Sequence, residues 1–359
     1  MSIENDYQPL PAREVPTDLL CCSPEELTGW LAGRGVAAYR AKQILKWIYH
    51  RQCNDFGDMT DLSKSLRQIL QDRFTIPSLE LTREQQARDG TRKFLFRLAD
   101  GNHIETVLIA ERNHATLCVS SQVGCALGCR FCRTARGGLV RNLTQGEILA
   151  QIRDVRQRSA GQAPLTNLVL MGMGEPLANF RRVVGSLAIV TNSDWGLAFA
   201  PRRVTLSTAG VVPRIRELGR ASPVNLAISL NAVDNATRSA LMPINDTYPL
   251  EKLLQACRAY PLRPNRRITF EYILIKDVND SPGAARKLAK LLRPIRAKIN
   301  LIPYNPHPGS EFSRPAADTI ADFQKILLDR HYPAMIRHSK GTDIAAACGQ
   351  LRARTEDGV

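Results

Sequence analysis

The sequence has no long apolar run. No stretch of its 359 residues approaches the roughly 20 apolar residues that a membrane-spanning helix needs. The N-terminus carries Glu4 and Asp6 and has no apolar core, so it does not resemble a secretory signal. We therefore expect a cytoplasmic protein that does not enter a membrane, in a compartment where structural disulfides are uncommon. The nine cysteines must then be buried thiols, metal ligands or catalytic groups.

Acidic residues are in the minority. The chain has 34 Asp and Glu against 49 Lys and Arg, which gives a formal net charge of +15. Such an excess favours a polyanionic partner, most simply nucleic acid. A soluble protein with a basic surface is the alternative that charge alone leaves open.

Internal repeats and low-complexity runs are also missing. We therefore expect one large domain with smaller parts attached. Residues 1–18 are polar and are expected to form a flexible tail. Residues 19–80 show helical patterns and are expected to form a small basic helical domain. Ser23, Pro24 and Glu26 have the spacing of a capped helix start. This domain either has a purely structural role or binds nucleic acid.

Beyond this domain the apolar pattern changes to a period of two and then to alternating strands and helices. Residues 81–115 are predicted to form a β extension with strands at 92–98 and 103–109. Residues 116–345 are predicted to contain βαβ units, with 346–359 as a C-terminal segment. The expected strands are 117–120, 167–172, 203–207, 225–230, 269–275 and 299–303. Six units favour a partial (β/α)6 α/β barrel, and a doubly wound open sheet is the competing architecture.

A cluster of cysteines follows the first of these strands. Cys125, Cys129 and Cys132 have CxxxCxxC spacing in a loop, and sites in parallel α/β folds form beyond the carboxyl ends of strands. Three thiolates can surround one inorganic core and leave a coordination position open for a substrate. A structural zinc site would need a fourth ligand, for which His103 and His114 are the nearest histidines, and the sequence offers no second cysteine pair.

The cysteine spacing resembles that of the radical S-adenosylmethionine (SAM) superfamily. In that superfamily the three cysteines hold a 4Fe–4S cluster, SAM binds the open iron, and reduction cleaves SAM to methionine and a 5′-deoxyadenosyl radical. The segment 172–176, Gly-Met-Gly-Glu-Pro, follows the second strand and is similar to the glycine-rich SAM motif. The resemblance therefore implies one 4Fe–4S cluster with Cys125, Cys129 and Cys132 as its ligands.

Longer segments narrow the resemblance to the RlmN/Cfr family of RNA adenine methyltransferases, and to its carbon-2 branch more than its carbon-8 branch. The segments that carry this resemblance are 39–49, 59–64, 131–135, 141–144, 172–177, 229–232, 300–306 and 343–350. They cover nearly the whole chain from about residue 20.

The family resemblance also implies which residues contact SAM. These lie at or just beyond the ends of expected strands and are Gly174, Glu175, Ser207, Ser229, Leu230, Asn231 and Asn305. The family more often has histidine where Asn231 stands. That difference matters little for a backbone contact and weakens the assignment if the contact is made by the side chain.

Three residues are implied to be catalytic. Cys348 accepts a methyl group from a first SAM, and a second SAM supplies the radical that activates it for addition to adenine. Cys118 then releases the RNA by forming a transient disulfide with Cys348, and Glu105 takes the proton from the adduct. An adenine ring carbon is not nucleophilic, so radical addition avoids a direct methyl transfer that should fail.

The resemblance implies 23S rRNA and tRNA as substrates, an electron donor such as flavodoxin or ferredoxin, and a monomer. Candidate phosphate contacts, chosen by charge, are Arg40, Lys42, Lys46, Arg92, Lys93, Arg202, Arg203, Arg352 and Arg354. The same chemistry at adenine carbon 8 is the nearest alternative. A radical SAM enzyme for another substrate and a non-catalytic zinc-containing RNA-binding protein are more distant ones. The cysteines that match no motif are Cys21, Cys22, Cys53 and Cys257.

Overall fold

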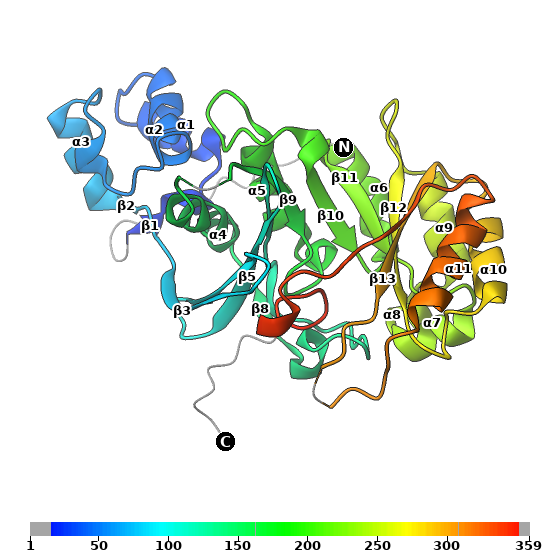
Figure 1. The fold of residues 1–359 in the computed structure, drawn as a ribbon. Coiled ribbons are helices and arrows are strands. Elements are labelled where there is room, and N and C mark those ends of the chain that lie inside the picture. The colour runs from blue at the N-terminus through cyan, green and yellow to red at the C-terminus, as the bar shows by residue number, and fades with distance from the viewer. Residues whose placement is uncertain (1–15, 162, 308, 352–359) are drawn as a thin grey trace. The chain divides into compact units, whose positions relative to one another are not determined.

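The protein is described by a computed structural model that covers residues 16–161, 163–307 and 309–351. Its chain divides into two compact units, Met1–Pro77 and Ser78–Val359 (Figure 1). The expected tail at 1–18 lies almost entirely outside the described residues. No helix in the described ranges is long and apolar enough to cross a membrane.

The first unit contains three helices, as predicted. These are α1 (Pro24–Ala32), α2 (Tyr39–Tyr49) and α3 (Lys64–Arg73). The predicted capping box is present, because Ser23 Oγ accepts from the Glu26 amide and the Glu26 carboxylate accepts from the Ser23 amide. Two short parallel strands, β1 (Thr17–Asp18) and β2 (Phe74–Thr75), pair the two ends of the unit. Its helices bury Leu27, Leu31, Ile44, Leu45, Ile48, Leu66 and Leu70.

The second unit is built on one large sheet. In the described residues its strand order is β14-β13-β12-β11-β10-β9-β6-β5-β4-β3. The β extension is antiparallel and consists of β3 (Glu80–Gln86), β4 (Arg92–Arg97) and β5 (His103–Ala110). The last two strands were predicted, and β3 was not. Because β5 pairs with β6 (Ala115–Cys118), the extension continues directly into the barrel strands.

The remaining strands of the sheet are parallel. They are β6, β9 (Leu165–Leu170), β10 (Val204–Thr208), β11 (Asn225–Ser229), β12 (Ile268–Leu274), β13 (Ala297–Pro303) and β14 (Ala334–Ile336). The helices that connect them are α4 (Gln145–Arg158), α5 (Phe180–Thr191), α6 (Val212–Ala221), α7 (Asn235–Leu241), α8 (Ile244–Thr247), α9 (Leu250–Arg258), α10 (Pro282–Leu292) and α11 (Ala317–Leu328). The order of the strands follows the chain without reversal, so right-handed crossovers keep the helices on one face. A doubly wound sheet would reverse its strand order. The partial (β/α)6 barrel is therefore confirmed, and β14 adds a seventh parallel strand that was not predicted.

Two features set the geometry at the carboxyl ends of these strands. A short antiparallel ladder, β7 (Gln122–Gly124) with β8 (Leu139–Asn142), lies on either side of the cysteine loop. After β14 the chain passes through a short 3-10 helix, Thr342–Ile344, and returns across the sheet (Figure 1). Both the cysteine loop and this returning segment reach the same cavity.

Candidate active site

A cavity of about 140 Å³ lies at the carboxyl ends of the parallel strands. We call it the chamber. Most of the residues predicted from the sequence line it: Cys125, Cys129, Cys132, Gly174, Glu175, Ser207, Ser229, Asn231 and Cys348. Leu230, Asn305, Glu105 and Cys118 are not part of its lining. The structure thus brings together segments that lie more than two hundred residues apart in the sequence.

The cysteine loop has its shape fixed by backbone contacts at its base. Gly124 has a φ of +77°, and a Cβ there would lie 2.0 Å from the Gly138 carbonyl oxygen. Only glycine therefore lets the β7–β8 ladder close. Beyond it, the Cys125 amide donates to the Gly138 carbonyl at 2.8 Å, and the Cys132 amide donates to the Cys129 carbonyl at 3.0 Å. These bonds hold the ladder and the loop in one conformation.

The three cysteines of the loop line the chamber together. Burial raises the pKa of Cys125 to about 11 and raises that of Cys129 as well. A bound cation would reverse this effect, because it favours the thiolate. In the described ranges no three His, Cys, Asp or Glu side chains are gathered to hold one ion. A zinc ion holds each thiolate at about 2.3 Å, whereas an iron–sulfur core is larger and is bound by more widely spaced thiolates.

The glycine-rich turn after β9 packs against the segment that leads to the cysteine loop. A Cβ on Gly172 would lie 2.7 Å from the Val119 carbonyl. Gly174 has a φ of +98°, and a Cβ there would lie 2.5 Å from the Cβ of Gln122. The Gly172 amide also donates to the Val119 carbonyl at 3.1 Å. Both glycines are required by this close approach, which holds the turn in a fixed position relative to the cysteines.

Glu175 connects this turn to the end of β10. Its side chain is buried, and its two carboxylate oxygens accept from the amides of Leu177 at 2.9 Å and Ala209 at 2.8 Å. Burial raises the pKa of Glu175, and these two backbone donors oppose that rise. The Thr208 side chain also hydrogen-bonds to this carboxylate, so only one of its oxygens keeps a lone pair for a further donor. Glu175 therefore has a structural role in addition to the SAM contact that we predict for it.

The side chain of Asn231 is used inside the protein. The residue is buried at a left-handed φ of +58°. Its Oδ1 accepts from the Ile273 amide at 2.9 Å, its Nδ2 lies 3.2 Å from Met242 sulfur, and its carbonyl accepts from Asn279 at 2.7 Å. A contact to SAM through its backbone fits this arrangement, and it would make the difference from histidine of little consequence.

Sequence reasoning missed Arg238, which stabilises the strand ends around the chamber. Its guanidinium is fully buried and donates to the carbonyls of Ala209 at 2.6 Å, Leu230 at 3.1 Å and Ser229 at 3.3 Å, and to Asn245 Oδ1 at 3.1 Å. Burial lowers the pKa of Arg238 to about 10. An arginine in a short polar helix is usually exposed, so no local pattern indicated this role.

Sequence reasoning also missed a buried polar pair on neighbouring strands. Glu271 of β12 lines the chamber and accepts from Asn300 Nδ2 of β13 at 2.9 Å. Burial raises the pKa of Glu271 to about 7. Asn300 Oδ1 and Asn305 Oδ1 are buried in the described structure without a hydrogen-bond partner. Such oxygens are rare in folded proteins, and neither of these two side chains lines the chamber.

Cys348 reaches the chamber on the returning C-terminal segment. The segment docks on the cysteine loop, because the Arg133 amide donates to the Gly349 carbonyl and Thr134 Oγ1 to the Leu351 carbonyl, each at 2.7 Å. Cys348 remains accessible through the chamber, but the surrounding walls desolvate its thiol and raise its pKa to about 12. Negative charge on Cys132, Cys118 and Glu271 contributes to that rise.

The other two predicted catalytic residues lie on β5 and β6. Glu105 is buried and forms an ion pair with Lys93 at 3.0 Å. Cys118 is buried, and burial raises the pKa of its thiol to about 12. Neither side chain lines the chamber, although Cys118 is near enough for its charge to act on Cys348.

The structure corrects part of the predicted RNA contacts. Arg92 and Lys93 are buried and pair with Glu84 at 2.6 Å and Glu105 at 3.0 Å, so the prediction that they contact phosphate is wrong. Strand β4 is covered on both faces, and charge alone could not reveal that. Arg202 and Arg203 are exposed as predicted. Arg352 and Arg354 lie outside the described residues.

The chain is similar to known proteins over most of its length. Residues 17–76 match the family model described as the ribosomal RNA large subunit methyltransferase N-terminal domain, and residues 119–289 match the radical SAM superfamily. The dual-specificity RNA methyltransferase RlmN of Desulfosudis oleivorans is 54% identical over 94% of this chain and 91% of its own. The same enzyme of Syntrophotalea carbinolica is 53% identical over 95% and 91%.

A solved structure is similar over most of the chain. The crystal structure of a radical SAM methyltransferase from Sphaerobacter thermophilus is 47% identical, with a TM-score of 0.88, and the match covers 94% of this chain and 100% of that one.

Proposed function

The chain belongs to the RlmN family of radical SAM RNA methyltransferases, and on that premise we propose that it methylates carbon 2 of adenine in 23S ribosomal RNA and in transfer RNA. The observation that carries the proposal is the position of Cys348. A cysteine near the end of the chain shares one chamber with the cysteine loop and the glycine-rich turn. A radical SAM enzyme of simpler chemistry needs no such residue.

The radical SAM family implies a 4Fe–4S cluster and SAM. In our proposal Cys125, Cys129 and Cys132 hold the cluster, and SAM lies against Gly174, Glu175, Ser207, Ser229, Leu230, Asn231 and Asn305. When bound, the cluster and SAM would supply a one-electron cleavage of SAM, and the radical that this cleavage forms would abstract hydrogen. SAM would also supply the methyl group, so one turnover uses two SAM molecules. A flavodoxin or a ferredoxin would supply the electron.

Cys348 acts as the methyl acceptor in this proposal. Its thiol must lose a proton before it can attack a methyl group, and its raised pKa means that the free chamber disfavours this step. The positive charge of the SAM sulfonium beside it would offset that effect. The carbon that Cys348 carries then joins adenine carbon 2, so the RNA becomes linked to the protein through the Cys348 sulfur.

Glu105 and Cys118 complete the proposed sequence. Glu105 takes the proton from adenine carbon 2, and the unpaired electron of the adduct must leave to a one-electron acceptor, a role that the oxidised cluster would fill when bound. The Cys118 thiolate attacks the Cys348 sulfur, a disulfide forms, and the bond from that sulfur to the new carbon breaks. The electron pair and a proton go to the carbon, which becomes the methyl group of the product. An external dithiol must then reduce the disulfide before the next turnover.

The test is mass spectrometry of nucleosides from ribosomal and transfer RNA, in cells with and without the gene. We expect 2-methyladenosine to disappear from both RNA fractions and to return with the wild-type gene, but not with a Cys348→Ala variant. Loss from one fraction only would limit the substrate to that RNA. Loss of 8-methyladenosine would assign the carbon-8 chemistry, and no change in either nucleoside would overturn the proposal.

A further inference from the structure

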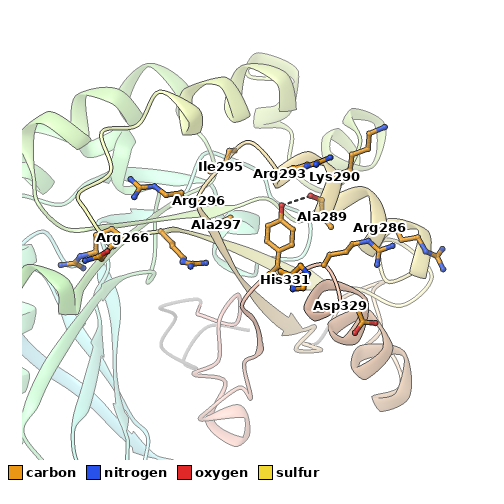
Figure 2. Close-up of a pocket in the computed structure, with 14 residues that line it drawn as sticks. Arg266, Arg286, Ala289, Lys290, Arg293, Ile295, Arg296, Ala297, Asp329 and His331 are labelled. Carbon is orange, nitrogen blue, oxygen red and sulfur yellow. Dashed lines mark hydrogen bonds between the residues drawn. The ribbon is translucent and has the colours of Figure 1, made fainter.

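The second unit has a much larger cavity than the chamber, of about 1030 Å³. Figure 2 shows that basic side chains surround it. We call it the basic hollow and define it by Arg266, Arg286, Lys290, Arg293, Arg296 and Arg330. Asp329 is the acidic residue in its lining. Nothing in the proposed reaction uses this cavity.

The basic hollow lies at the opposite end of the barrel strands from the chamber. Its residues come from α10 and from the loops that lead into β12, β13 and β14, which places them at the amino ends of these strands. The chamber lies at the carboxyl ends. Along β12, the chamber-lining Glu271 follows the hollow-lining Arg267 by four residues, which corresponds to about 13 Å at 3.3 Å per residue. The hollow is therefore a separate site.

Its positive charges are not neutralised within the described protein. The side chains of Arg286, Lys290, Arg293 and Arg296 are exposed, and no described carboxylate forms an ion pair with them. Like charges held together at one place repel one another, so a bound anion would relieve a cost that the fold otherwise carries. One wall is braced, because the Tyr332 hydroxyl donates to the Ala289 carbonyl at 2.9 Å (Figure 2).

Basic residues continue from the hollow along the amino ends of the strands. Arg266 donates to Asn225 Oδ1 at 2.5 Å, and Asn225 Nδ2 in turn donates to the Arg202 carbonyl at 2.8 Å. A smaller cavity beside Asn225 shares Arg266 with the hollow and adds Arg263. The exposed Arg202 and Arg203 follow before β10. An elongated surface of this kind suits a chain of phosphates better than a single anion.

We propose that the basic hollow binds backbone phosphates of the substrate RNA, in a segment remote from the adenine that enters the chamber. The inference rests on the proposed function for its choice of RNA. Arginine predominates, and its planar guanidinium suits phosphate. The apolar lining residues Ala289, Ile295 and Ala297 are buried, so the hollow presents no apolar anchor of the kind that protein partners use.

The experiment compares two variants with equal loss of charge. The hollow variant is Lys290→Gln/Arg293→Gln/Arg296→Gln. The control variant is Arg216→Gln/Lys252→Gln/Lys325→Gln, which changes exposed residues of α6, α9 and α11 that do not line the hollow. The holoprotein is titrated, over a series of salt concentrations, with a long transcript of a folded ribosomal RNA domain and with a short hairpin. SAM cleavage without RNA checks that each variant keeps an intact chamber.

For the long transcript, we expect the hollow variant to bind about tenfold more weakly than the control variant. The slope of its log affinity against log salt concentration should be smaller in magnitude by about 2, because each lost phosphate contact removes roughly 0.7 to 0.9 from that slope. The short hairpin cannot extend to both sites, so its affinity should change equally in the two variants. Equal slopes for the two variants on the long transcript would overturn the inference. So would unchanged RNA binding with slower cluster reduction by an acidic electron-donor protein, which would make the hollow a protein site.

The same experiment separates this inference from the proposed function. The wild-type protein could form no methyladenosine and still have a steeper salt dependence than the hollow variant on the long transcript. That result would overturn the proposed function and leave RNA binding at the hollow. Wild-type protein that methylates RNA, with a hollow variant that binds the long transcript as the control does, would overturn only the hollow.

Discussion

Lys93 and Glu105 form an ion pair at 3.0 Å across the β4–β5 ladder, with only 10% and 8% of their side chains exposed. Lys93 stands opposite Val107 in the register, so the two charged residues are diagonal neighbours on one face of the sheet. Lys93 Nζ also donates to the Ala345 carbonyl at 3.4 Å. The pair thus connects the proposed base to the segment that carries Cys348.

We expect Lys93→Gln to lower the free energy of unfolding by about 3 to 5 kcal/mol, because it leaves Glu105 buried without its ammonium partner. Urea unfolding followed by circular dichroism measures this loss. Arg97→Gln is the matched control on the same strand, since its pair with Glu80 is 3.6 Å long and more than half exposed. The Arg97→Gln substitution should lower the free energy of unfolding by less than about 1 kcal/mol. Equal losses for the two variants would show that the Lys93–Glu105 pair contributes no more than a surface contact.

The cysteines of the chamber should separate into two classes. Cys125→Ala should lose both the brown iron–sulfur absorbance and RNA methylation, because it removes a proposed ligand. Cys348→Ala should keep the absorbance and lose methylation. Cys257→Ala, which changes a buried cysteine outside the chamber lining, should keep both. Absorbance near 400 nm and transfer of labelled methyl to RNA measure the two properties, and an active Cys348→Ala variant would rule out the methyl-cysteine route.

Gly124 should be essential for loading the cluster. Gly124→Ala places a Cβ 2.0 Å from the Gly138 oxygen and forces a φ of +77° on alanine, so the β7–β8 ladder should open. Iron bound per chain after anaerobic reconstitution should fall severalfold. Gly137→Ala in the same loop is the control, because a Cβ there meets nothing within 4 Å. Equal iron content in the two variants would contradict this account of the loop.

Glu271 should make stability depend on pH. Its pKa is about 7 in the folded protein and 4.5 as the ordinary value, so the folded state favours the protonated form. The stability that Glu271 contributes through its raised pKa is complete below about pH 4.5. It is lost as pH rises toward 7, at about 1.4 kcal/mol of unfolding free energy per pH unit. The free energy of unfolding should therefore fall more steeply with pH, between about 5 and 7, in the wild type than in Glu271→Gln. Parallel curves for the two proteins would contradict the assignment.

The barrel and most of the chamber could be predicted because they depend on local patterns. The parallel strands from β6 to β13 are short and rich in buried apolar residues, and the cysteine loop and glycine-rich turn come soon after two of them. The resemblance to a family added Cys348, Cys118 and Glu105, which no local pattern identifies. Strand β3 escaped prediction because its residues are mostly exposed and polar, so its sequence has no apolar period.

What could not be predicted depends on contacts between distant segments. Arg238 is buried because three strand-end carbonyls converge on it, and Glu271 is buried because Asn300 stands beside it on the next strand. The misassigned Arg92 and Lys93 show the same limit, since a basic residue reads as exposed until its partner is known. The sign of a charge can be read from the sequence, whereas its surroundings depend on the fold.

The docking of the C-terminal segment on the cysteine loop has a consequence for how the protein matures. Arg133 and Thr134 lie just beyond Cys132, and they hold the backbone on either side of Gln350. Disorder in a cysteine loop that has not yet received its metal would therefore pass directly to Cys348. In the proposed function, insertion of the cluster and placement of the Cys348 thiol would therefore be coupled.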